Sequence, residues 1–361
     1  MRESCNLHGR LAESAISLSK GDVMKVRVCV DAMGGDEEPS VVLQGIAEAL
    51  AADSELEVLV AGPEEVVGEF CRTHDRAEAL MAPDVITMED DPIKAVMTKR
   101  KSSIVLACRA IKKGNAQGFF SAGSTGAVTA AATAYVTPFR YEQDGERRPV
   151  RPCITTAVPN AKDGLTVFAD MGANPDVEPD DIVRFAQMAS AYARVVCGIE
   201  SPSVGLLSNG TEEHKGSRFT QACFPLMAER VPGFAGNCEG TDLLSGRLDV
   251  IVSDGFAGNI ALKATEGAAK YLLGELKSAL MGSVKGKLAA LLVKDALYAI
   301  KDKLSGDARG GAILLGLKGV VLIGHGATSV EAVKNGTLAT ASAVRAGLVD
   351  AVAGSVDGIV A

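Results

Sequence analysis

The stretch Ser121-Ala122-Gly123-Ser124-Thr125-Gly126-Ala127 lies between an apolar, strand-like run at 117–120 and a helical segment rich in small residues. Glycines let backbone amides approach a ligand closely, and the hydroxyl groups beside them add further donors. A helix that begins at such a turn directs the positive end of its dipole at an anion. The stretch therefore predicts a phosphate-binding turn at the end of a β-strand.

Short β-rich runs alternate with helix-length segments along the chain. The runs fall at 26–30, 57–60, 85–88, 117–120, 155–158, 165–169, 203–207, 248–252 and 319–323. Strands spaced in this way predict a mainly parallel sheet with helices on both faces. The expected fold class is therefore α/β, doubly wound. We expect a single domain over 26–361, preceded by a disordered extension over 1–25.

Composition excludes several classes of protein. The chain has 361 residues, of which 47% are hydrophobic, enough to bury a sizeable core. Its eight cysteines form no Cys-x-x-Cys pair and its four histidines show no ligand spacing, so we expect reduced, mostly buried thiols in a cytoplasmic protein, and no metal. The net charge of -8 argues against nucleic acid as a partner.

Residues suited to turns and anion binding follow six of the predicted strands. They are Asp31-Ala32-Met33-Gly34-Gly35-Asp36, the run 121–127, Asp170-Met171-Gly172-Ala173-Asn174, Ser208-Asn209-Gly210-Thr211-Glu212, Asp254-Gly255-Phe256-Ala257-Gly258-Asn259 and Gly324-His325-Gly326. Each alone is ordinary turn chemistry. In a parallel sheet, ligands bind outside the carboxyl ends of the strands. Six such stretches together predict one active cleft along one edge of the sheet.

Familiar cofactor and hydrolase motifs are absent from the sequence. The first strand is followed by acidic residues that would repel a pyrophosphate, and neither a P-loop nor a Gly-x-Ser-x-Gly elbow occurs. No cofactor is therefore expected. What remains is an anion site with cationic help from Lys99-Arg100-Lys101-Ser102-Ser103, which directly precedes a helical segment. His325 follows a strand between two glycines, and a structural and a catalytic role are equally open.

Residues 276–304 break the alternation of strands and helices. Apolar residues recur at helical spacing, and six lysines stand against two aspartates, a local charge of +4. The pattern fits a membrane-surface helix as well as a dimer-facing or core-capping helix pair. Gly282 and Gly286 are expected to break or hinge this segment.

These motifs together resemble the bacterial phosphate acyltransferases of phospholipid synthesis, the PlsX family, from about residue 26 to about residue 343. Besides the strand-end stretches, the resemblance rests on Lys101-Ser102-Ser103, Arg151-Pro152, Lys215-Gly216, Leu262-Lys263 and Leu314-Leu315-Gly316. The family usually has Asn where Ser124 stands, and the acidic run at 210–213 is shifted by one residue.

The resemblance implies a reaction and partners. Inorganic phosphate attacks the thioester of a long-chain acyl group on acyl carrier protein, which yields acyl phosphate and the free carrier thiol. It also implies a sheet similar to that of phosphotransacetylases and isopropylmalate-type dehydrogenases, and a homodimer. The family further implies peripheral association with the inner face of the membrane, which favours the membrane role of 276–304.

Phosphate is already nucleophilic near neutral pH and thiolate is a fair leaving group, so the site must position its substrates and stabilise charge. We expect phosphate to be held by Lys101, Ser102, Ser103, Ser121, Gly123, Ser124, Thr125 and Gly126. Candidates for stabilising the oxyanion or protonating the leaving sulfur are Lys215, Asn259, Lys263 and His325. Orienting roles are expected for Asp31, Gly34, Gly35, Asp36, Asp170, Gly172, Asn174, Asp254 and Gly255.

Two alternatives stay open at this point. One is a phosphotransacetylase-like enzyme that uses acyl-coenzyme A, which differs in its thioester donor. The other is a non-catalytic membrane-surface scaffold, although a scaffold has no physical need to keep so many strand-end glycine, aspartate, asparagine and lysine residues.

Overall fold

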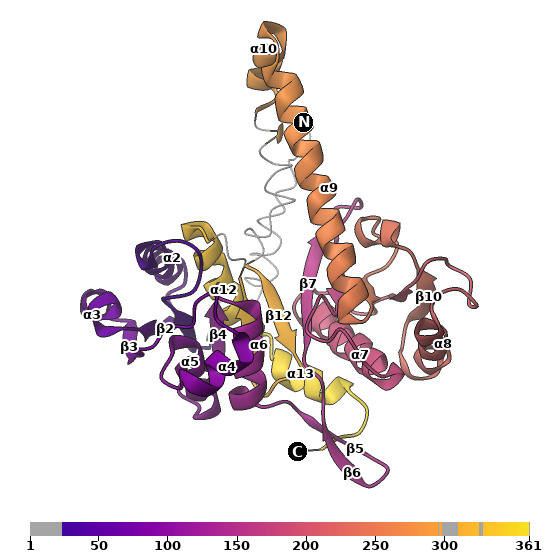
Figure 1. The fold of residues 1–361 in the computed structure, drawn as a ribbon, viewed down its shortest axis with the longest axis horizontal. Helices are drawn as coiled ribbons and strands as arrows, with labels where there is room; N and C mark the ends of the chain where they lie inside the picture. Colours follow the sequence, from indigo (N-terminus) through magenta and orange to yellow (C-terminus); the bar gives the residue numbers. More distant parts are fainter. Residues whose placement is uncertain (1–23, 295, 298–309, 325–327, 361) are drawn as a thin grey trace.

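The computed structural model describes residues 24–294, 296–297, 310–324 and 328–360 (Figure 1). The strands of the main sheet are β1 (Val26–Asp31), β2 (Leu56–Gly62), β3 (Ala77–Met81), β4 (Gly118–Ser121), β7 (Cys153–Pro159), β8 (Leu165–Ala169), β9 (Val204–Leu207), β10 (Phe234–Cys238), β11 (Val250–Val252), β12 (Ala312–Leu315) and β13 (Val320–Ile323). Within the described residues these eleven strands form one sheet, in the order β10-β9-β11-β8-β7-β12-β13-β4-β1-β2-β3. A small second sheet has the order β14-β5-β6 and is built from β5 (Arg140–Gln143), β6 (Glu146–Pro149) and β14 (Ile359–Val360).

Helices cover both faces of the main sheet, which confirms the predicted fold class. One face packs against α2 (Pro39–Ala52), α3 (Glu64–Thr73), α7 (Pro179–Val195), α8 (Arg218–Arg230), α12 (Val330–Arg345) and α13 (Leu348–Ser355). The other packs against α4 (Pro92–Thr98), α5 (Ser103–Lys112), α6 (Thr125–Ala131), the π-helical turn η1 (Ala132–Val136) and the 3-10 turn η2 (Gly240–Leu244). The alternation of a strand divides Phe119 and Phe120 between the two cores, and both side chains are buried.

Eight of the nine predicted strands lie on observed strands, and the one at 85–88 is wrong. That run is a loop whose Ile86 is buried in the core. The edge of the sheet is instead β3, which pairs with β2. Its sequence, Ala77-Glu78-Ala79-Leu80-Met81, consists of good helix formers, so local propensity pointed away from a strand.

The prediction that all strand ends share one edge of the sheet is also wrong. Strands β13, β4, β1, β2 and β3 run parallel to one another, as do β8, β11, β9 and β10. The three pairings at the centre, β13 with β12, β12 with β7 and β7 with β8, are all antiparallel. An odd number of reversals leaves the two halves of the sheet running in opposite directions.

The strand ends meet instead along a row that crosses the middle of the sheet. Direct pairings join Val30, Phe120, Leu322, Ile313, Thr155, Ala169, Val252 and Leu206 into that row. Asp31 and Ser121 directly follow the row residues Val30 and Phe120, so they lie on one side of the row. Asp170 and Ser253 directly follow Ala169 and Val252, whose strands run the opposite way, so they lie on the other side of the row. The loops of the two halves therefore flank the central β12 and β7 from opposite sides. Four strand spacings separate β4 from β8, about 19 Å along the sheet.

A helical hairpin projects from the body of the molecule (Figure 1). Helix α9 (Gly255–Met281) has 27 residues and a length of about 40 Å, and α10 (Val284–Leu292) lies at its far end. Gly282 ends α9, as predicted, whereas Gly286 lies inside α10. Residues 295 and 298–304 of the predicted segment, and 1–23 of the predicted extension, lie outside the described residues. No helix in the described part of the chain combines the length and apolar character needed to cross a bilayer.

Candidate active site

A buried hydrogen-bond network holds the predicted phosphate-binding turn against the first strand. The hydroxyl of Ser121 donates to Oδ2 of Asp31 at 2.8 Å, and the amide of Gly123 donates to Oγ of Ser121 at 3.0 Å. The amide of Met33 donates to Oδ1 of Asp31 at 3.0 Å. Burial raises the pKa of Asp31, while hydrogen bonds from Ser103, Ser121 and Met33 act in the opposite sense.

This network divides the predicted phosphate-binding residues into two groups. Ser121 has one hydroxyl proton, and Asp31 accepts it, so Ser121 has none left for a phosphate oxygen. The amide of Gly123 is likewise engaged. Ser124 is half-buried and Thr125 and Gly126 are exposed, which leaves their donors accessible. The turn therefore consists of a buried support and an exposed donor edge.

Lys101, Ser102 and Ser103 divide in the same way. Lys101 is exposed, whereas the two serines are buried. Oγ of Ser102 accepts from the amide of Val105 at 3.4 Å and caps α5. Only Lys101 of this group presents a charge at the surface.

Glycine is required at position 34 because the turn passes it so closely. A Cβ on Gly34 would lie 2.8 Å from the amide nitrogen of Gly123 and 2.9 Å from Oδ2 of Asp31. Gly35 has a φ of +113°, which favours glycine. Asp36 is exposed, and none of the hydrogen bonds of this network involves it.

A second network surrounds Asp170, at the end of β8. Oδ1 accepts from the amides of Ile154, Gly172 and Ala173 at 2.9 to 3.2 Å. Oδ2 accepts from the amide and the side-chain Nδ2 of Asn174 at 2.8 and 2.9 Å. Five donors leave this carboxylate no capacity to bind substrate or act as a base. Burial raises the pKa of Asp170 and these hydrogen bonds oppose the rise.

The base of α9 packs directly on the loop that Asp170 organises. Asp254 caps the helix by accepting from the amide of Ala257 at 2.7 Å. The amide of Gly255 donates to the carbonyl of Asn174 at 2.8 Å. A Cβ on Gly258 would lie 1.9 Å from the carbonyl oxygen of Asp170. The two glycines thus let the helix approach the loop and fix the orientation of its first turn.

The four candidate donors have different surroundings. Asn259 is exposed, and its Cγ would lie 3.5 Å from a Cβ on Gly172. Lys263 is one turn further along α9, and its Nζ pairs with Glu266 at 2.8 Å. Lys215 is half-buried in the loop after β9. His325 lies outside the described residues.

Two asparagines shape the Lys215 loop: Asn209, which stands in one of the predicted strand-end stretches, and Asn237, which sequence reasoning did not single out. Asn209 accepts from the amide of Gly216 at 2.8 Å, and the side-chain amide of Asn237 donates to the carbonyl of Glu212 at 2.8 Å. No local pattern identifies Asn237, because it reaches this loop from β10. Together with the bond from the amide of Lys215 to the carbonyl of Glu212 at 3.0 Å, these bonds hold the loop that carries Lys215.

Sequence reasoning also missed the contribution of α4 to the phosphate-binding turn. A Cβ on Gly126 would lie 2.8 Å from Cγ of Pro92, so the start of α4 rests against the exposed donor edge. The sequence did indicate that this segment suits an anion site, because residues 92–141 contain no aspartate or glutamate.

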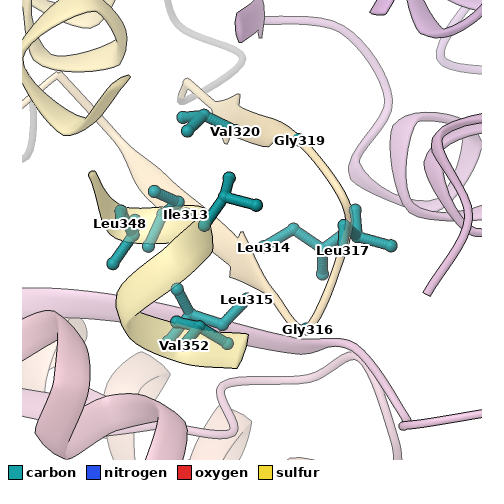
Figure 2. Close-up of a pocket in the computed structure, with 10 residues that line it drawn as sticks. Ile313, Leu314, Leu315, Gly316, Leu317, Gly319, Val320, Leu348 and Val352 are labelled. Atoms are coloured by element: carbon teal, nitrogen blue, oxygen red, sulfur yellow. The ribbon is translucent and has the colours of Figure 1, made fainter. Parts of the chain in front are cut away.

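The Leu314-Leu315-Gly316 motif has a packing role. It lines a small apolar gap between β12, β13 and α13 that also involves Val320, Leu348 and Val352 (Figure 2). The gap has a volume of about 10 Å³, at most the space of one water, so it does not admit an acyl chain.

Solved structures show that other proteins share this fold. A phosphotransacetylase from Streptococcus pyogenes superposes with a TM-score of 0.56 at 16% identity, covering 93% of this chain and 97% of that one. The EutD phosphotransacetylase from Staphylococcus aureus gives 0.54 at 17% identity, with the same coverage. The chain therefore has the mixed α/β fold found in phosphotransacetylases.

The chain belongs to the fatty acid synthesis protein family, whose model matches residues 26–350, and is a PlsX-type phosphate acyltransferase. A protein of Desulforudis audaxviator named phosphate acyltransferase is 41% identical over 333 residues, which cover 92% of this chain and 96% of that protein. A phosphate acyltransferase of Levilactobacillus brevis is 40% identical over 315 residues, covering 86% and 89%.

Proposed function

We propose that this protein transfers a long-chain fatty acyl group from the thioester of acyl carrier protein to inorganic phosphate, and so supplies acyl phosphate for glycerophospholipid synthesis. A phosphate oxygen forms a bond to the carbonyl carbon, the carbon–sulfur bond breaks, and the departing thiolate takes up a proton. Family membership and the named relatives support acyl transfer to phosphate. The carrier as donor rests on the family resemblance.

The observation that carries this proposal is the exposed donor edge supported by a buried network. Because Asp31 and Ser121 fix the turn from below, the donors of Ser124, Thr125 and Gly126 are already oriented before phosphate arrives. Lys101 supplies a positive charge two residues before Ser103, whose side chain hydrogen-bonds Asp31 in the same network. A phosphate held in this way keeps an oxygen free to attack a carbonyl carbon.

Charge that develops on the thioester requires a donor from another part of the protein. Asn259 is our first choice for the oxyanion, since its side chain is exposed and the base of its helix is fixed on the Asp170 loop. Lys215 and His325 are candidates for protonating the leaving sulfur. Lys263 is a weaker candidate, because Glu266 already neutralises part of its charge. No side-chain base is needed for the phosphate nucleophile.

The projecting hairpin supports the proposals of membrane association and of a homodimer. On α10, Val284, Leu288, Leu291 and Leu292 are 86%, 61%, 69% and 80% exposed. Lys285 and Lys287 lie between them in sequence. A helix with exposed apolar and basic side chains suits the surface of an anionic bilayer. We assign α10 to peripheral contact with the inner face of the membrane, and the exposed apolar side chains of α9 to contact with a second copy of the chain.

The decisive experiment supplies different thioester donors in turn. Purified protein receives phosphate with either acyl carrier protein thioester or acyl-coenzyme A, and acyl phosphate is trapped as its hydroxamate. Phosphate-dependent product from the carrier thioester is expected. Preference for acyl-coenzyme A would assign the phosphotransacetylase-like activity instead. Absence of product from every donor would favour the alternative of a non-catalytic membrane-surface scaffold.

A further inference from the structure

An unusually basic segment surrounds the phosphate-binding turn. Residues 92–141 carry eight lysines and arginines and no acidic residue, in a chain whose net charge is -8. The segment includes α4, α5 and α6, which lie together in the fold (Figure 1). Charge of one sign gathered in this way raises the encounter rate with partners of the opposite sign.

Three basic side chains shortly before Ser102 and Ser103 form no ion pair within the described residues. Lys94, Arg100 and Lys101 are exposed, and among the residues that the structure describes none of them forms an ion pair. Lys99 differs, because it pairs with Asp90 at 2.6 Å. Three cations are thus available to a partner from solution.

Exposed apolar side chains lie among these cations. Ile93 and Met97 on α4 are 68% and 63% exposed. They are four residues apart, so they lie on the same face of the helix. A single exposed apolar residue is ordinary. An apolar pair that includes methionine, flanked by unpaired lysine and arginine, has the composition of a protein-docking surface.

The position of α4 relates this surface to the reaction. Pro92 rests against Gly126, at the exposed donor edge of the phosphate-binding turn. The carbonyl carbon must come within bonding distance of the bound phosphate. A protein that delivers it on an arm has to rest within the arm's reach of the turn, and α4, which borders the turn, satisfies this condition.

We propose that Ile93, Lys94, Met97 and Arg100, together the α4 surface, are the docking site of the acyl carrier protein. This inference rests on the proposed function. The partner it fits is a small protein with an acidic face, whose carboxylates meet Lys94 and Arg100 while apolar side chains cover Ile93 and Met97. Acidic residues precede α4 at 89–91, so the partner's carboxylates are expected toward the C-terminal end of the helix.

The test combines a charge reversal with two thioester donors. The double variant Lys94→Glu/Arg100→Glu is expected to raise the KM for the carrier thioester about tenfold, because two attractive charge pairs become repulsive. Its kcat/KM for S-acyl pantetheine, which carries the same thioester without the protein, should stay within about twofold of the unaltered enzyme. Fluorescence anisotropy with labelled carrier should report a similar, salt-sensitive loss of affinity.

A matched control lies at the C-terminal end of α5, about 15 Å along that helix from its start at Ser103. Lys112→Glu/Lys113→Glu makes the same change of charge there and should bind the carrier normally. Equal weakening by both pairs would mean diffuse attraction, and unchanged carrier affinity in Lys94→Glu/Arg100→Glu would remove the docking site; either result overturns the inference. Absence of acyl phosphate from every donor would refute the proposed function, whereas anisotropy would still measure docking.

Discussion

Replacing Gly258 by alanine tests how the base of α9 is fixed to the Asp170 loop. The added Cβ would lie 1.9 Å from the carbonyl oxygen of Asp170 and 2.7 Å from Oγ of Ser253. Both are well inside van der Waals contact, and the first obstacle is backbone, which cannot rotate away. The first turn of the helix must therefore shift away from the loop.

The destabilisation expected from Gly258→Ala is the sum of three contributions. Overpacking of this kind costs about 3 kcal/mol at the upper end of its usual range. Loss of the Gly255 to Asn174 backbone hydrogen bond adds about 1 kcal/mol. The better helix propensity of alanine stabilises the helix by about 1 kcal/mol and offsets part of this loss. We therefore expect the base of α9 to be destabilised by about 3 kcal/mol, a factor of roughly one hundred.

Hydrogen–deuterium exchange is the appropriate measurement, because α9 projects from the body and its base can open without global unfolding. Amides in the first turns of α9 should exchange about one hundredfold faster in Gly258→Ala. The matched control is Gly267→Ala in the same helix, where no atom lies within 4 Å of the added Cβ, so exchange should slow about fivefold. Equal exchange in the two variants would refute the close contact between α9 and the loop.

Other predictions concern the two networks, phosphate and the membrane. Lys101→Ala should raise the KM for phosphate at least about tenfold by removing an oriented charge; unchanged phosphate kinetics would exclude this lysine from the site. Thr125→Ala should raise the same constant, whereas Ser121→Ala should mainly lower the free energy of unfolding by about 1 to 3 kcal/mol, because its hydroxyl supports Asp31; a phosphate effect confined to Ser121→Ala would contradict this division. Asp170→Asn should destabilise the protein by about 2 to 4 kcal/mol in urea unfolding, since an amide group would face backbone donors. Glutamate at all three leucines of α10 should abolish liposome sedimentation while soluble activity persists, and continued sedimentation would locate membrane contact elsewhere.

Much of the site could be predicted because it depends on local chemistry. A glycine-rich turn after a strand, a serine before a helix and an aspartate at a strand end each act within a few residues. Ser102 and Asp254 cap α5 and α9 in the structure. The roles of individual hydroxyls could not be predicted in the same way. Ser121 differs from Ser124 because Asp31, ninety residues away, accepts its proton.

The sequence by itself determined the alternation of strands and helices, and with it the α/β fold class, since hydrophobic periodicity and turn residues act locally. Only the tertiary structure decided the direction of each half of the sheet. That direction follows from the antiparallel pairing of β7 with β8 and of β12 with its neighbours, contacts that no local pattern encodes. The tertiary structure also decided which donors of the phosphate-binding turn remain free, because a hydrogen bond to a distant partner removes a donor that the sequence presents as available.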